Sequence, residues 1–197
     1  MIMKKLVFAS LMLASVNGFA QGTMKDIMKR IQVGVTAGGN YSDFMNADFD
    51  TEGLPGFHAG LILGFKINDK LSIQEEFLFS QQGAKLKGDF LEKQDLKLYY
   101  MSIPILLKYR TKSGVYFEAG PQASFKVKED VVGITGEDFA EKLDFGVAGG
   151  LGFQSKSGFG IGARYVYGFS PVGAFKTSAV KKDFTNTVAQ VSIFYIF

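Results

Sequence analysis

Residues 56–67, GFHAGLILGFKI, alternate two kinds of side chain over their whole length. The odd-numbered positions are apolar and mostly large, whereas the even-numbered positions hold Gly, His, Ile and Lys. Successive side chains of a β-strand point to opposite faces of a sheet. This stretch therefore predicts a strand with one bulky apolar face and one face that is mostly small or polar.

The same period of two recurs along the chain, and no helical period competes with it. A content of 24 Gly and 20 Phe favours an all-β fold, because glycine weakens helices and aromatic residues favour strands. Besides 56–67, strands are predicted at 31–38, 71–82, 97–110, 115–127, 143–154 and 159–169, and a last strand ends at Phe197.

The connections between these strands alternate in length. Residues 68–70, 112–114 and 156–158 predict three-residue hairpin loops, two of which carry Gly where a positive φ is favoured. The other connections, 40–55, 83–96, 128–142 and 170–186, are long and polar. Short periplasmic turns and long extracellular loops are typical of outer-membrane barrels. Residues 31–197 therefore predict an eight-stranded antiparallel up-and-down transmembrane β-barrel, with both termini on the periplasmic side.

Three residues do not fit the pattern. Glu75 falls on the apolar face of its strand, and the sequence offers no reason for it. Pro104 and Pro121 lie inside predicted strands, where each removes a backbone donor. Because they fall almost opposite each other, we expect a bulge or bend shared by the two strands, or a different strand boundary there.

The bulky face could point to lipid, or inward around a ligand as in a soluble lipocalin-like barrel. A bore of about eight strands is only just wide enough for side chains or one small ligand, so bulky residues on every strand would overfill it. Aromatic residues cluster near the strand ends, as in the girdles of membrane barrels, although β-propensity alone could scatter them so. The predicted girdles are Phe57, Phe79, Tyr99, Phe125, Phe145 and Phe169 on the long-loop side, and Phe65, Tyr109, Phe117, Phe153, Phe159 and Tyr195 on the short-turn side.

Residues 1–20 have the three parts of a secretory signal peptide: Lys4 and Lys5, an apolar run over 6–16, and the small residues Gly18 and Ala20. We expect cleavage before Gln21 and a short periplasmic lead over 21–30; the alternative is a membrane anchor. Removing two Lys and no acid from the formal charge of +3 leaves +1, which does not point to nucleic acid. The chain has no Cys, which excludes disulfides and thiolate metal sites.

Several segments resemble the PorT-like outer-membrane β-barrel domain family. They are YMSIPILLKYR at 100–110, YFEAGPQ at 116–122, LDFGVAGGLGF at 143–153, ARYVYG at 163–168 and LSIQEEFLFSQQG at 71–83, where the inward acid would be Glu76. The resemblance covers residues 32–197 and implies the barrel fold. The founding member's role in protein secretion cannot be carried over to this chain residue by residue.

The last strand alternates Val191, Ile193, Tyr195 and the terminal Phe197. This pattern resembles the signal read by the barrel-assembly machinery. The alternative is simply a last strand that faces lipid.

Charged side chains recur on the small or polar face. A buried charge must be paired to offset its desolvation, so we interpret them as a structural salt-bridge network across the lumen rather than a pore lining or a catalytic pair. We expect Lys108 to pair with Glu118, and Arg164, beside Gly150 and Gly162, to reach Glu76 or Glu118. The predicted network is Lys66, Glu76, Lys108, Arg110, Glu118, Asp144 and Arg164, with Lys126 on the same face.

His58, the one histidine, could serve a hydrolase or acyltransferase as a base. Asp43, Asp48 and Asp50 occupy the nearby first loop, but no ligand spacing predicts a metal among them. The glycines around Gly150 continue a strand and form no phosphate cradle. The sequence therefore predicts no catalytic residue, metal or cofactor.

Together these features predict an integral outer-membrane protein that is not an enzyme and presents four extracellular loops. It would act as an anchor or adhesin, or as an accessory in envelope assembly or protein secretion. Its expected partners are outer-membrane lipid, the barrel-assembly machinery during insertion, and an unidentified envelope or secretion protein. The alternatives are a small pore or transporter, and a membrane-embedded lipid hydrolase or acyltransferase using His58.

Overall fold

The computed structural model describes residues 23–46, 51–88, 91–130, 141–172 and 184–197. The chain divides into two units, Met1–Ile31 and Gln32–Phe197. The first contains the short helix α2 (Thr23–Met28), within the predicted periplasmic lead. The predicted signal peptide lies outside the described residues. No described helix has both the length and the apolar character needed to span a membrane.

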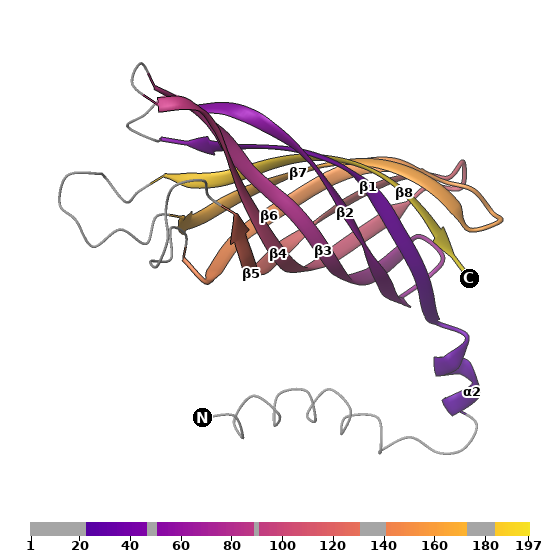
Figure 1. Ribbon diagram of the computed structural model, residues 1–197. Helices are drawn as coiled ribbons and strands as arrows, with labels where there is room; N and C mark the ends of the chain where they lie inside the picture. Colours follow the sequence, from indigo (N-terminus) through magenta and orange to yellow (C-terminus); the bar gives the residue numbers. More distant parts are fainter. Residues whose placement is uncertain (1–22, 47–50, 89–90, 131–140, 173–183) are drawn as a thin grey trace, which may run out of the picture. The chain divides into compact units, whose positions relative to one another are not determined.

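The described part of the second unit is a closed barrel in which every strand pairs antiparallel with its sequence neighbours, and β1 closes against β8 (Figure 1). This confirms the predicted fold. The strands are β1 (Ile31–Met45), β2 (Thr51–Lys66), β3 (Leu71–Gly88), β4 (Leu91–Arg110), β5 (Val115–Asp130), β6 (Leu143–Gln154), β7 (Phe159–Pro171) and β8 (Thr185–Ile196).

The three short turns have the predicted geometry. Gly114 and Gly158 adopt φ values of 100° and 97°, which a residue with a Cβ rarely tolerates. In the turn between β2 and β3, the side chain of Asn68 accepts hydrogen bonds from the backbone of Lys70 and Leu71. The register that these turns set pairs Lys108 with Glu118, as predicted from the sequence.

The strands continue further toward the long-loop end than the sequence indicated. Much of the expected loops 40–55 and 83–96 is strand, so that β3 reaches Gly88 and β4 begins at Leu91. A strand needs only about 9–11 residues to cross a bilayer, and beyond it the outer face meets water. The apolar alternation then fades although the hydrogen-bonded ladder continues, and this is why the prediction ended these strands too early.

The apolar face points outward. Leu61, Phe117 and Phe145 expose 56%, 53% and 51% of their surface, whereas Glu76 and Lys108 expose 3% each. A soluble protein would bury the first group and expose the second. The distribution therefore requires a hydrocarbon environment around the wall, and all twelve predicted girdle aromatics lie on this outward face.

The lumen is less polar than the sequence suggested, because Tyr116, Phe194 and Ile196 pack inside it with Ile62. Glycines on neighbouring strands make room for these rings. A Cβ at Gly162 would lie 2.1 Å from the Tyr116 hydroxyl, and one at Gly160 would lie 2.1 Å from the Phe194 ring. The large inward residues fit a narrow bore only because the positions facing them have no side chain.

The expected bulge at the prolines is wrong. The pairing of β4 with β5 keeps one register from Pro104–Gln122 to Leu107–Ala119, with an interruption of the ladder between these pairs. The register shift on these strands lies instead between Tyr99 and Tyr100. A missing proline donor is thus accommodated by a gap in the ladder without an extra residue.

Glu75 faces outward, opposite Leu63 on β2 and Ile105 on β4. It lies midway between Leu71 and Phe79, about 13 Å along the strand from each. In the part of the chain that the structure describes, no side chain pairs with its carboxylate. This places a charged group in the apolar band of the wall.

We expect Glu75→Leu to raise the free energy of unfolding by roughly 1–2 kcal/mol, because charged groups on the lipid face of a barrel are destabilising near mid-membrane. Urea titration of the protein in lipid vesicles, followed by the gel mobility of unboiled samples, measures this change. Leu63→Glu is the matched control and should lower stability. A loss of stability in Glu75→Leu would mean that the carboxylate has a partner in the membrane.

Candidate functional site

Arg164 of β7 forms the centre of the lumen. Its guanidinium donates to both carboxylate oxygens of Glu76 on β3, at 2.7 Å each, and to Oε1 of Glu118 on β5, at 2.7 and 2.9 Å. Side-chain exposure is 10% for Arg164 and 4% and 3% for the two acids. Two-pronged arginine–carboxylate contacts are strong and directional, so this arrangement links opposite walls of the barrel.

Lys108 completes the charge balance without pairing with Glu118, contrary to the sequence-based expectation. Its ammonium group donates to Gln74 at 3.3 Å and lies 3.9 Å from the centre of the Tyr116 ring and 4.5 Å from that of Phe194. Arg164 bonds only Oε1 of Glu118, and Oε2 has no hydrogen-bond partner among the described residues, so the lysine cation lies on the two aromatic faces, which attract it, although one carboxylate oxygen stays free. We name Glu76, Lys108, Glu118 and Arg164 the lumen quartet; it holds two cations and two carboxylates.

The remaining predicted network residues lie elsewhere. Arg110 donates to the backbone carbonyls of Gln154 and Ser155 at the short-turn end, where Lys66 is exposed. Asp144 is half-buried, and its Oδ1 atom has no hydrogen-bond partner. Lys126 forms an ion pair with Glu129 at 2.6 Å. The predicted set is therefore several separate groups, of which only the quartet bridges the lumen.

His58 belongs to a second buried network that the sequence reasoning missed. Its Nδ1 lies 2.7 Å from Oδ1 of Asn40, and its Nε2 lies 2.8 Å from Oγ of Ser192. The Asn40 amide nitrogen donates to the carbonyls of Phe57 and Gln81, so its oxygen faces the imidazole. Neutral His58 must then carry its proton on Nδ1 and accept one from Ser192 on Nε2. The sequence signal that could have indicated this network is the row of polar residues at inward positions of β1 and β8.

Of the acids suspected near His58, the structure describes only Asp43, which forms no hydrogen bond with the imidazole. Asp43 accepts a hydrogen bond from the backbone of Phe44, whereas Asp48 and Asp50 lie outside the described residues. Across the described ranges, no group of three or more His, Asp or Glu side chains could hold a metal ion.

The described lumen is filled at several levels. Beside the quartet and Ser192 lies a cavity of about 10 Å³, which is the size of one water. Toward the long-loop end, an apolar cluster fills the bore, formed by Phe44, Ala84, Leu96, Leu98, Tyr100, Val172 and Phe184. A solute would have to displace both layers to pass through.

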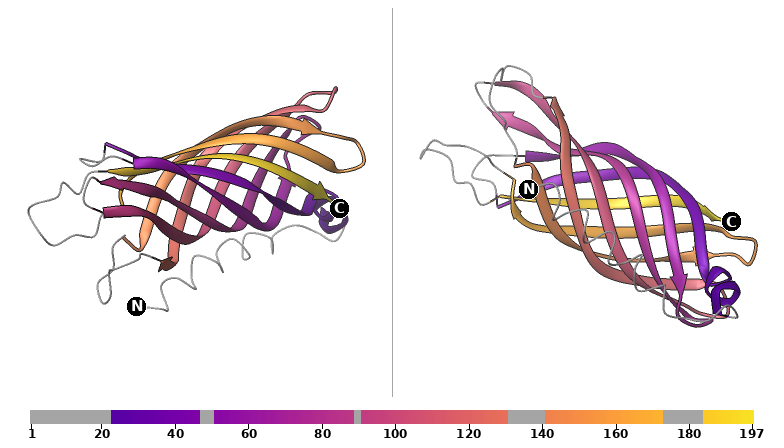
Figure 2. Two further views of the ribbon diagram at one scale, coloured as in Figure 1. Left: turned by 45° about the horizontal axis from the view of Figure 1, so that its top comes forward. Right: turned by 90° about the horizontal axis from the view of Figure 1, so that it is seen from below.

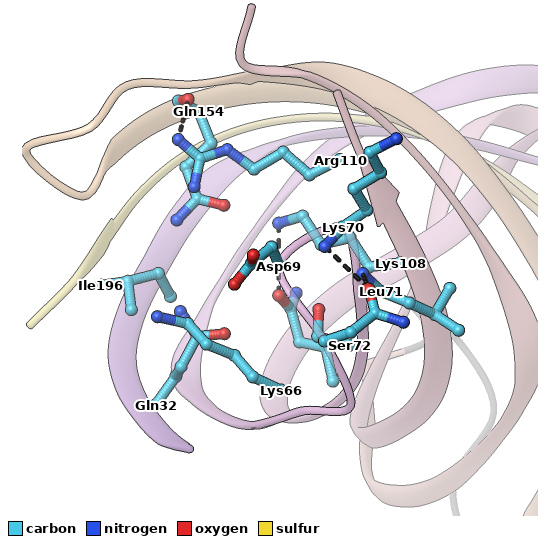
Figure 3. A pocket seen from close by; sticks show the side chains of 12 residues that line it. Gln32, Lys66, Asp69, Lys70, Leu71, Ser72, Lys108, Arg110, Gln154 and Ile196 are labelled. Carbon is cyan, nitrogen blue, oxygen red and sulfur yellow. Dashed lines mark hydrogen bonds between the residues drawn. The ribbon is translucent and has the colours of Figure 1, made fainter. Parts of the chain in front are cut away.

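The short-turn end of the barrel opens into a polar hollow (Figure 3). We name its four cations, Lys66, Lys70, Lys108 and Arg110, the cationic mouth. Asp69 is the one acid that lines the hollow, and Gln32, Ser72 and Gln154 add neutral polar groups. The residue pattern at 68–70 predicts only a turn, and no local pattern indicates that these four cations meet.

An apolar outer wall around a closed antiparallel barrel with a charged, packed lumen defines a small integral outer-membrane protein. The chain belongs to the outer membrane protein beta-barrel domain family, whose model matches residues 19–173. No curated protein matches the sequence significantly.

Solved structures share the fold at low sequence identity. Neisserial surface protein A is 18% identical with a TM-score of 0.55, and the alignment covers 85% of this chain and 97% of that one. Ail, the attachment invasion locus protein of Yersinia pestis, is 17% identical with a TM-score of 0.50, covering 84% and 98%. At such identities the likeness concerns the fold alone.

We expect Arg164→Met to lower the free energy of unfolding by about 3–5 kcal/mol, because it leaves two buried carboxylates without their cation. Thermal or urea unfolding in vesicles, read from gel mobility, measures the loss. A triple variant that adds Glu76→Gln and Glu118→Gln to Arg164→Met should recover part of the lost free energy of unfolding, because it no longer buries unpaired charges. Lys112→Met on an exposed turn is the control; equal effects of the two single changes would remove Arg164 from the network.

Proposed function

We propose that this protein is a non-enzymatic, non-conducting barrel that acts through its extracellular surface, as an adhesin or anchor or as an accessory in envelope assembly or protein secretion. The observation that carries the proposal is the filled lumen. The lumen quartet and the apolar cluster that includes Leu98 and Tyr100 occupy the bore at different levels. With the interior occupied by the protein's own side chains, the surfaces remain for recognition.

The length of β3 and β4 supports an extracellular role. These strands have 18 and 20 residues, whereas β6 and β8 have 12 each. They are longer by roughly seven to eleven residues than a strand that only crosses the bilayer. Figures 1 and 2 show their hairpin projecting beyond neighbouring strands at the end opposite the C-terminus. Leu96 and Leu98, buried at its base, anchor this projection to the apolar cluster.

The hydrogen-bond order Asn40–His58–Ser192 resembles that of a serine hydrolase, which keeps lipid hydrolysis or acyl transfer as the alternative. The room beside Ser192 argues against it, because the adjacent cavity accommodates a water and no acyl group. A fluorophosphonate probe should therefore leave the folded protein unlabelled. Labelling that His58→Ala abolishes would favour the hydrolase.

Replacing residues 86–94 by Asn-Gly tests the surface role, because it removes the outer part of the projecting hairpin, keeps Ala84 and Leu96 of the apolar cluster, and leaves a two-residue turn between the paired residues Lys85 and Asp95. We expect the variant to remain folded in the outer membrane while cells displaying it lose at least tenfold in adherence to arrays of immobilised proteins and polysaccharides. Heat-dependent gel mobility verifies folding. Undiminished adherence, or conductance of the intact protein in planar bilayers, would contradict the proposal.

The finer PorT-like assignment and recognition by the barrel-assembly machinery are part of the same proposal. Phe197 is 77% exposed, and its backbone nitrogen donates to Val33 while its ring packs on Tyr195. A terminal aromatic that ends the closing strand is accessible to a receptor before β8 pairs with β1.

Deletion of Phe197 should reduce the yield of heat-modifiable protein in the outer membrane several-fold, because the terminal signal is lost. Quantitative blotting of outer-membrane fractions measures it. The variant Phe197→Tyr keeps an aromatic terminus and should assemble normally. Unchanged assembly after the deletion would leave β8 as an ordinary lipid-facing strand.

A further inference from the structure

The cationic mouth has more positive charge than its own chain neutralises. Lys108 is balanced within the lumen quartet, which leaves Lys66, Lys70 and Arg110 around the single acid Asp69. Asp69, Lys66 and Lys70 form no ion pair with any described residue. The mouth thus gathers three cations around one carboxylate, which leaves an excess of positive charge among the residues that line it.

Arg110 shows an unfilled bonding capacity at the same place. Its Nη2 donates to the carbonyls of Gln154 and Ser155, at 3.0 and 3.1 Å, which fixes the guanidinium across the hollow. Its Nε is buried and has no hydrogen-bond partner. A buried donor on a cation is costly to leave unpaired, and such an atom points to a bound water or ion.

The space fits a small anionic group with a larger body attached. The hollow has a volume of about 40 Å³, room for roughly three waters. A neighbouring cavity of about 200 Å³ shares Gln32, Lys66, Arg110 and Gln154 with it and extends along the turn between β6 and β7. A ligand could place its charged head among the cations and its remainder in this second cavity.

We propose that the cationic mouth binds an oxyanion, a phosphate or carboxylate group presented from the periplasm. Guanidinium and ammonium donors in a partly enclosed site suit both groups, with Arg110 offering directional donors and the lysines mobile charges. Short turns mark the periplasmic end of outer-membrane barrels. The site therefore faces cell-wall and lipid components on the side opposite the projecting hairpin, and it is independent of the extracellular role.

The test uses the full mature chain in nanodiscs of zwitterionic phospholipid, titrated with inorganic phosphate and separately with acetate at constant ionic strength. Calorimetry and the midpoint of thermal unfolding report binding. We expect a saturable response to at least one anion. The double variant Lys66→Gln/Lys70→Gln should weaken it at least tenfold; both side chains are exposed and unpaired, so the barrel should fold.

Lys112→Gln is the matched control, because Lys112 is exposed at the same end of the barrel but does not line the hollow. It should titrate like the wild type. Saturation by only one of the two anions identifies which group the site binds. Nanodiscs that contain anionic phospholipid test the source of that group: if lipid headgroups already occupy the site, added phosphate gives no response. A response that sodium chloride reproduces, no response to either anion, or a double variant that titrates like the wild type would overturn the proposal.

Discussion

The structure depends on one constraint: in hydrocarbon there is no water to satisfy a backbone N–H or C=O, so the sheet must pair every strand and close on itself. The pairing of β1 with β8 provides that closure. Once the cylinder is closed, alternation along each strand assigns every residue within the bilayer either to lipid or to the bore. The distribution of apolar, small and charged side chains follows from this division.

A closed bore of eight strands is narrow, and its contents must pack and also be electrically balanced. Glycines such as Gly160 and Gly162 create the space in which Phe194 and Tyr116 lie. Arg164 on β7 reaches across the bore to Glu76 on β3 and also binds Glu118 on β5, and Lys108 lies against the aromatic rings. Packing and charge balance together fill the described levels of the interior, and this supports the proposal that recognition occurs at the two ends or the outer wall.

The two ends of the barrel differ in chemistry. The long-loop end combines a buried apolar cluster with the long hairpin of β3 and β4. The short-turn end gathers Lys66, Lys70 and Arg110 around a polar hollow. The two ends therefore suit different kinds of partner, and the side chains that fill the lumen separate one end from the other.

The sequence by itself determined the number and order of the strands, their antiparallel register through the short turns, and the outward direction of the apolar face, but not how far β3 and β4 extend. These properties are encoded by alternation and turn residues within a few positions of one another. Only the tertiary structure decided what meets across the bore: that Lys108 contacts Gln74 and two rings instead of Glu118, and that His58 lies between Asn40 and Ser192. Those contacts join residues up to 134 positions apart. Barrel closure, strand tilt and the length of each side chain bring these residues together, and no local sequence pattern specifies such contacts.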